Sequence, residues 1–292
     1  MKKILVLVLT LVVILSLAAC GSSASAPAVT EAPAAGTPAP AEETAAEPVK
    51  LVVGASSTPH GELLEIVKPV LAEQGIDLEI VIYDDYVLPN TALQDGTLDA
   101  NYFQHAPYMN SFNEANGTDL VSAGLVHYEP MGIYSTTLKD LKDLEKGATI
   151  LVPDDVSNQT RALLLLQQEG LIELPEDASV ETAPSVLDIK DAKGYTVQAA
   201  QADAVPSLLT NSPKGTIAVI NYNYALNAGF KTTDALAIED AAGNAAQTYA
   251  NLVAVRRGDE NRPEIKALVE ALQDGAVETF NEQTGAGIVS IK

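Results

Sequence analysis

The chain has 292 residues and carries 17 basic against 39 acidic side chains, which gives a net charge of −22 at pH 7. So acidic a chain repels the phosphate backbone, and we expect no nucleic-acid partner. Its single cysteine excludes a fold held by internal disulfides, so packing must stabilise the folded part.

The first residues have the pattern of a secretory signal. A short basic start precedes an apolar run from Ile4 to Leu17, which is too short to span a bilayer comfortably but suits a signal-peptide core. The run ends in Leu17-Ala18-Ala19-Cys20, small residues before a cysteine that resemble a bacterial lipobox. We expect residues 1–19 to be a lipoprotein signal peptide and Cys20 to carry a lipid on its sulfur. The alternative is an ordinary secretory signal with an incidental cysteine.

Residues 20–48 are rich in Ala, Pro, Ser, Thr and Glu and contain no Leu, Ile or Phe. Such a composition cannot support a core, so it predicts a disordered tether. No later apolar run approaches transmembrane length. The sequence therefore predicts a soluble domain that a lipid holds at the extracytoplasmic face of the cell membrane.

From residue 49 on, strand-like and helix-like segments alternate, which predicts an α/β architecture with largely parallel sheets. The expected strands are 50–56, 77–83, 148–155, 216–221 and 251–261. The expected helices are 57–75, 88–98, 158–170 and 262–283. Ligands of open α/β sheets bind beyond the carboxyl ends of strands, which directs attention to residues 56–60, 83–90, 153–161 and 221–224.

The stretch DANYFQHAPYMN, residues 99–110, gathers polar and aromatic side chains in a chain that is poor in aromatics. Asp99 and Asn101 are poor strand formers and Pro107 breaks a helix, so we expect an irregular segment. Mixed aromatic and amide side chains are typical of a pocket wall. A metal site and a corner of the core are the alternatives.

Arg161 lies near the start of a predicted helix, after a cap at Ser157 or Asn158. A cation there opposes the helix dipole and needs compensation. Either Arg161 pairs with Asp154 or Asp155, or it binds the carboxylate of a ligand.

Asn221 ends one predicted strand and Asn251 begins another. An amide side chain supplies both a donor and an acceptor, which suits a zwitterionic amino acid. For either Asn alone, a turn or capping role is the commoner explanation.

His60, His105 and His127 suggest zinc or manganese, with a carboxylate as a further ligand, but no two of them form a close pair such as HxH. We expect no metal and no cofactor. The sequence also has no GxSxG motif, no cysteine nucleophile, and no Walker or GxGxxG loop. We therefore expect no enzymatic activity.

Several stretches together resemble the methionine-binding lipoproteins of bacterial ABC importers, the MetQ/NlpA type. They are YDDYVLPNTAL, DANYFQHAPYM, GIYS, VPDDVSNQTRALLLLQQEGLI, IAVIN and YANLVAVR, and the resemblance spans nearly all of residues 50–292. It implies a periplasmic-binding-protein fold, in which two α/β lobes joined by two crossover strands close over a ligand cleft. One lobe would hold residues 50–138 plus 247–292, and the other 139–246.

The resemblance also implies roles. Arg161 would grip the ligand carboxylate, with Asn158 three residues before it, and Asn221 and Asn251 would hold the polar end. Tyr86 and Phe103 would form an aromatic wall around the methionine side chain, and His105 and Tyr108 would line the same region. The partners it implies are methionine and a membrane permease with its ATPase. We expect the protein itself to be a monomer.

The sequence departs from many family members in VSNQTR, at Tyr102, and at Tyr222 and Asn223. These positions leave L-methionine as the expected ligand, with D-methionine, a methionine dipeptide or another small amino acid as alternatives. A metal-binding lipoprotein and an adhesion lipoprotein with an unused cleft are the competing functions.

Overall fold

The computed structural model describes residues 47–240 and 245–291. The predicted signal peptide, Cys20 and the tether up to residue 46 lie outside the described residues. No helix in the described ranges is long and apolar enough to cross a membrane.

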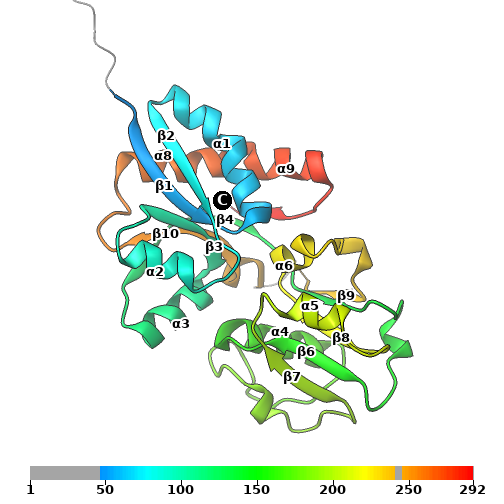
Figure 1. The fold of residues 1–292 in the computed structure, drawn as a ribbon. Coiled ribbons are helices and arrows are strands. Elements are labelled where there is room, and N and C mark those ends of the chain that lie inside the picture. Colours follow the sequence, from blue (N-terminus) through cyan, green and yellow to red (C-terminus); the bar gives the residue numbers. More distant parts are fainter. Residues whose placement is uncertain (1–46, 241–244, 292) are drawn as a thin grey trace, which may run out of the picture. The chain divides into compact units, whose positions relative to one another are not determined.

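The first of two sheets has six strands in the order β11-β4-β10-β3-β1-β2. They are β1 (Val49–Ala55), β2 (Ile76–Ile82), β3 (Ala100–His105), β4 (Leu120–Tyr128), β10 (Ala250–Arg256) and β11 (Val289–Ser290). Three helices cover one face of this sheet (Figure 1), namely α1 (Glu62–Glu73), α8 (Pro263–Ala271) and α9 (Val277–Thr284). Two helices pack on the other, α2 (Leu88–Gln94) and α3 (Ala106–Asn116).

The second sheet has five strands in the order β7-β6-β8-β5-β9. They are β5 (Gly132–Tyr134), β6 (Thr149–Pro153), β7 (Thr196–Ala200), β8 (Ile217–Ile220) and β9 (Ala237–Ile238). The helix α4 (Val156–Gln168) packs on one face, and α5 (Val205–Thr210) and α6 (Tyr222–Asn227) pack on the other. Short turns of helix accompany the second sheet: η2 (Leu141–Asp143), η3 (Val186–Asp188) and η4 (Thr232–Asp234). The short helix α7 (Ala245–Thr248) leads into β10 and packs with residues of the first sheet.

The α/β prediction is confirmed, but the expectation of largely parallel sheets is wrong. β1 is parallel to β2 and β3, whereas β10 is antiparallel to both β3 and β4. In the second sheet β5 is antiparallel to β8 and β9. The chain therefore passes between the sheets after β4 and returns to the first sheet with β10. The pairing places β5 in the second sheet, although a lobe boundary at residue 138 would group it with the first.

The sequence predicted an irregular segment at residues 99–110, but the structure has a strand, β3, followed by a helix, α3. Every residue of β3 is buried, because this strand lies between β1 and β10 in the sheet. Tertiary burial outweighs the weak strand propensity of Asn101. Pro107 occupies the first turn of α3, where its missing N–H leaves no hydrogen bond unmade.

Two predicted helices also differ from the structure. α4 begins at Val156, and the side chain of Asp155 caps it by accepting a hydrogen bond from the Asn158 backbone N–H at 3.0 Å. Arg161 therefore lies in the second turn, not the first. The C-terminal helix is interrupted by a turn, η5 (Leu272–Ala276), in which Gly275 has φ 86°. That left-handed conformation suits glycine and separates α8 from α9.

Candidate ligand-binding site

A small cavity lies where strand ends from both sheets meet. Its volume is about 20 Å³. All eight residues that the sequence analysis named for the ligand line it, and four others do as well: Gln104, Glu129, Tyr222 and Asn223. Half of the twelve follow a strand directly or lie in the first turn of a helix, and four lie within β3 or β10. The predicted segments 83–90, 153–161 and 221–224 all contribute to this wall, while 56–60 contributes none of the lining residues.

One part of the wall is aromatic. The ring of Tyr86 lies 5.6 Å from that of Phe103, 5.4 Å from that of Tyr108 and 4.7 Å from that of Tyr224, measured between centroids. The Tyr86 hydroxyl donates a hydrogen bond of 2.5 Å to Oδ1 of Asn223, which connects the segment after β2 to α6. Aromatic faces of this kind favour contact with a thioether sulfur.

Asn158 connects the polar part of the wall. Its Nδ2 donates to both carboxylate oxygens of Asp155, and its Oδ1 accepts from Asn221 Nδ2 at 2.8 Å. The same Oδ1 lies 3.1 Å from His105 Nε2. Because His105 Nδ1 accepts the Tyr108 backbone N–H, its Nε2 carries the hydrogen and donates to Asn158. Burial, with Arg161 nearby, lowers the pKa of His105 to about 3, so this ring is neutral at pH 7.

Arg161 is buried and forms an ion pair that the sequence analysis did not find. Its Nε and Nη2 donate to the carboxylate of Glu239 at 2.5 to 3.1 Å, and Nη2 also donates to the backbone oxygen of Glu129 at 2.7 Å. The guanidinium lies over the Tyr249 ring at 4.3 Å. Burial disfavours the charge, but Glu239 outweighs it and keeps the pKa of Arg161 above its ordinary value. Neither Asp154 nor Asp155 is its partner.

Two amide atoms in the wall are buried without a hydrogen-bond partner. They are Oδ1 of Asn221, an acceptor, and Nδ2 of Asn223, a donor. Buried polar atoms are nearly always paired in folded proteins, so unpaired atoms in a cavity indicate a ligand that completes them. Sequence reasoning singled out Asn221 but noted Asn223 only as a departure from the family.

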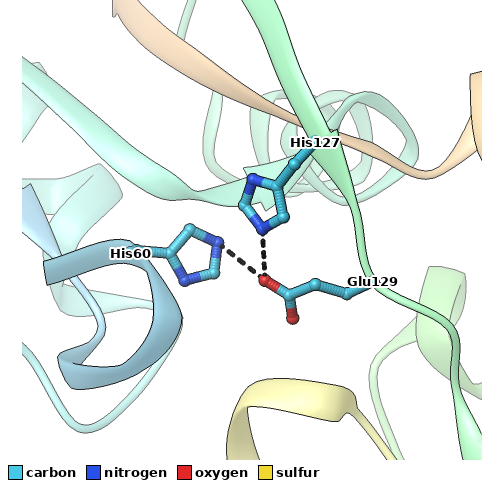
Figure 2. Close-up of side chains that lie close together, drawn as sticks. All are labelled: His60, His127 and Glu129. Carbon is cyan, nitrogen blue, oxygen red and sulfur yellow. Dashed lines mark hydrogen bonds and ion pairs between the residues drawn. The ribbon is translucent and has the colours of Figure 1, made fainter. Parts of the chain in front are cut away.

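Beside the cavity, two histidines converge on Glu129 (Figure 2). Oε1 of Glu129 lies 2.7 Å from His127 Nε2 and 3.2 Å from His60 Nε2. Burial lowers the pKa of His127 to about 3 and that of His60 to about 4. Burial raises the pKa of Glu129, while His60, Arg161 and the Asn223 backbone N–H act in the opposite direction.

The alternative of a metal site that contains all three histidines is wrong, because His105 bonds to Asn158 and lies outside this cluster. The other two histidines and Glu129 offer ligand atoms within 4.8 Å of one another, a donor set that zinc accepts. Their present distances are those of N–H to oxygen hydrogen bonds. A metal would require both Nε2 atoms to lose their hydrogens.

Comparison with known proteins shows the family of the chain. The model of the NlpA lipoproteins matches residues 51–290. The chain belongs to the NlpA lipoprotein family. The methionine-binding lipoprotein MetQ of Bacillus subtilis (strain 168) is 41% identical over 246 residues, which are 82% of this chain and 87% of that protein. The D-methionine-binding lipoprotein MetQ of Escherichia coli (strain K12) is 34% identical over 245 residues, 82% of this chain and 86% of that protein.

Among solved structures, a nutrient binding protein from Burkholderia cenocepacia bound to methionine matches with a TM-score of 0.77 and 39% identity. The match covers 83% of this chain and all of the Burkholderia chain. The two mixed sheets are thus the two α/β halves of a periplasmic-binding-protein fold, which confirms the predicted fold class. These NlpA relatives are named as binding proteins and not as enzymes.

Proposed function

We propose that this chain is the extracytoplasmic binding lipoprotein of an ABC importer and that it binds L-methionine in the cavity between its sheets. The observation that carries the proposal is that two parts of one buried cavity's wall have different side chains. Aromatic rings line one part, and Arg161 with two unpartnered amide atoms lines the other. The names of the relatives, which refer to methionine and D-methionine, support the same ligand class.

In this proposal the ligand's carboxylate lies against Arg161. Glu239 occupies Nε and Nη2 and leaves Nη1. Nη1 and the free Nδ2 of Asn223 would then be the donors for the carboxylate. The methionine side chain would extend toward Tyr86, Phe103 and Tyr108, where aromatic faces favour its sulfur.

Binding would involve no chemistry. Residues of the two halves bond across the cavity through Tyr86 to Asn223 and through His105 to Asn158. We propose that each sheet with its helices acts as a lobe, that the ligand shifts the population toward the state with these bonds formed, and that this state docks on the permease. Residues 1–19 would be removed and a lipid on Cys20 would hold the protein at the membrane.

The test is calorimetric titration of L-methionine into the full chain in detergent. The protein is first stripped of bound ligand in denaturant and refolded. One-site saturation at micromolar affinity or better is expected. Saturation by D-methionine or by a methionine dipeptide, with no heat from L-methionine, would keep the site and change the ligand. No heat from any of the three would overturn the proposal.

A further inference from the structure

Glu129 is a buried carboxylate of which only one oxygen is used by its histidine neighbours. The residue follows the end of β4 and is 5% exposed. Both histidines contact Oε1, and Figure 2 shows the second oxygen pointing away from both rings. Glu129 also lines the cavity. The Asn223 backbone N–H also donates to this carboxylate. The second oxygen, which neither histidine contacts, is the part of the group that a ligand can reach.

The two histidines do not neutralise Glu129. Ser56 Oγ lies 2.7 Å from His60 Nδ1, and the Tyr102 hydroxyl lies 2.5 Å from His127 Nδ1. Glu129 and Asn251 present only oxygen acceptors to the Nε2 atoms, so each Nε2 carries a hydrogen. Burial lowers the pKa of His60 to about 4 and that of His127 to about 3, so at pH 7 each Nδ1 is unprotonated and accepts from its hydroxyl. One hydrogen on each ring means that both rings are uncharged.

Arg161 does not neutralise Glu129 either. It is the only cationic side chain among the described residues that line the cavity, and its ion pair is with Glu239. Its contact with Glu129 is to the backbone oxygen. When Glu129 is ionised, its negative charge therefore has no cation of its own at the cavity. A buried charge in that position is costly unless a ligand supplies the opposite charge.

The same cavity has an excess of acceptors beside that charge. Asn221 Oδ1 has no donor, and Asn251 Oδ1 receives only a 3.1 Å contact from His60 Nε2. A primary ammonium group carries one positive charge and three donors. We propose that Glu129 recognises the α-ammonium of the bound amino acid, and that His60 and His127 are positioning residues that hold its other oxygen. This inference rests on the proposed function and adds the group that selects for a free amine.

The first test needs no variant. L-methionine and its desamino analogue, 4-(methylsulfanyl)butanoate, share the carboxylate and the thioether and differ only in the ammonium. For the full chain in detergent, we expect calorimetry to show at least about 30-fold weaker binding of the analogue, the lower part of the range for buried charge pairs. Equal affinities would overturn the inference while leaving the proposed function intact. No binding of methionine would overturn both.

The second test locates the selectivity. Glu129→Gln keeps the shape but removes the charge, so the preference for methionine over the analogue should fall to within a few-fold. Glu173→Gln, on a side chain that is 60% exposed, is the matched control and should keep the full preference. A Glu129→Gln variant that folds and keeps the full preference would overturn the assignment.

A third test asks whether His127 positions Glu129, and it measures the ratio of the affinities for methionine and its desamino analogue. His127→Phe removes the donor to Oε1 and should lower the methionine-to-analogue ratio, whereas His127→Gln restores a donor and should recover it. An equal loss of affinity for both ligands would indicate a structural role only and contradict the inference. Loss of methionine binding after EDTA, restored by Zn²⁺, would assign the cluster to a metal and also overturn it.

Discussion

Arg161 and Glu239 form a buried pair whose two members can be removed separately or together. The Arg161 side chain is 4% exposed and that of Glu239 is 12% exposed. Arg161→Met would leave Glu239 buried without its cation, and loss of one partner from such a pair costs about 3–5 kcal/mol of unfolding free energy. Arg161→Met with Glu239→Gln removes both charges, and we expect the double variant to recover most of that loss.

Ligand affinity should follow a different pattern from stability. We expect the double variant to fold but to have no cation for the methionine carboxylate, so its affinity should fall by about 2–5 kcal/mol, or about 30- to 4,000-fold. Glu239→Gln alone keeps the cation and removes a competing carboxylate, so it should bind methionine at least as tightly as the unaltered chain.

The assay combines urea unfolding, followed by circular dichroism because the chain has no Trp, with calorimetric titration of methionine. A double variant that binds methionine with unaltered affinity would show that Arg161 serves the fold and not the ligand. A single Arg161→Met variant as stable as the unaltered chain would refute the account of the buried pair itself.

Three further predictions concern the Tyr86 hydroxyl, the buried histidines and the lipid on Cys20. Tyr86→Phe keeps the ring but loses the hydroxyl bond to Asn223, so calorimetry should show about three- to tenfold weaker methionine binding; an unchanged affinity would mean that this bond does not act in the liganded state. The three histidines have pKa values lowered to about 3–4, so below about pH 6.5 the unfolded chain binds protons that the native state does not. Stability should therefore fall as the pH drops from about 6.5 to 4, by up to about 2 kcal/mol per histidine at pH 5, and His105→Gln should reduce the slope of urea-derived stability against pH. The raised pKa values of Glu129 and Asp155 act in the opposite direction, and a flat profile would contradict the buried neutral histidines. Cys20→Ser should move the protein from the membrane to the soluble fraction on fractionation, since the lipid supplies about 0.8 kcal/mol per buried CH₂, whereas membrane retention would refute the anchor.

The residues that sequence could place are those near strand ends. Tyr86, Asn158 and Asn221 follow β2, β6 and β8, and the general rule for α/β sheets brings such positions together. The periodicity of residues 77–83 and 158–170 was likewise enough to predict β2 and most of α4. Local patterns of this kind do not depend on distant partners.

The residues that sequence missed depend on contacts between distant segments. Arg161 pairs with Glu239, 78 positions away, and no local feature distinguishes that carboxylate from Asp154 or Asp155. Glu129 has no motif of its own, and its significance appears only when His60, from the segment before α1, meets it. The strand at residues 100–105 was missed for a similar reason, because burial between two neighbours decides its conformation.

The most direct test of the central claim is calorimetric titration of L-methionine into the refolded, ligand-free chain, run beside the Arg161→Met, Glu239→Gln double variant. The account predicts saturable one-site binding at micromolar affinity or better for the unaltered chain and a loss of at least about 30-fold in the double variant. Absence of binding by the unaltered chain, or equal binding by both proteins, would contradict it.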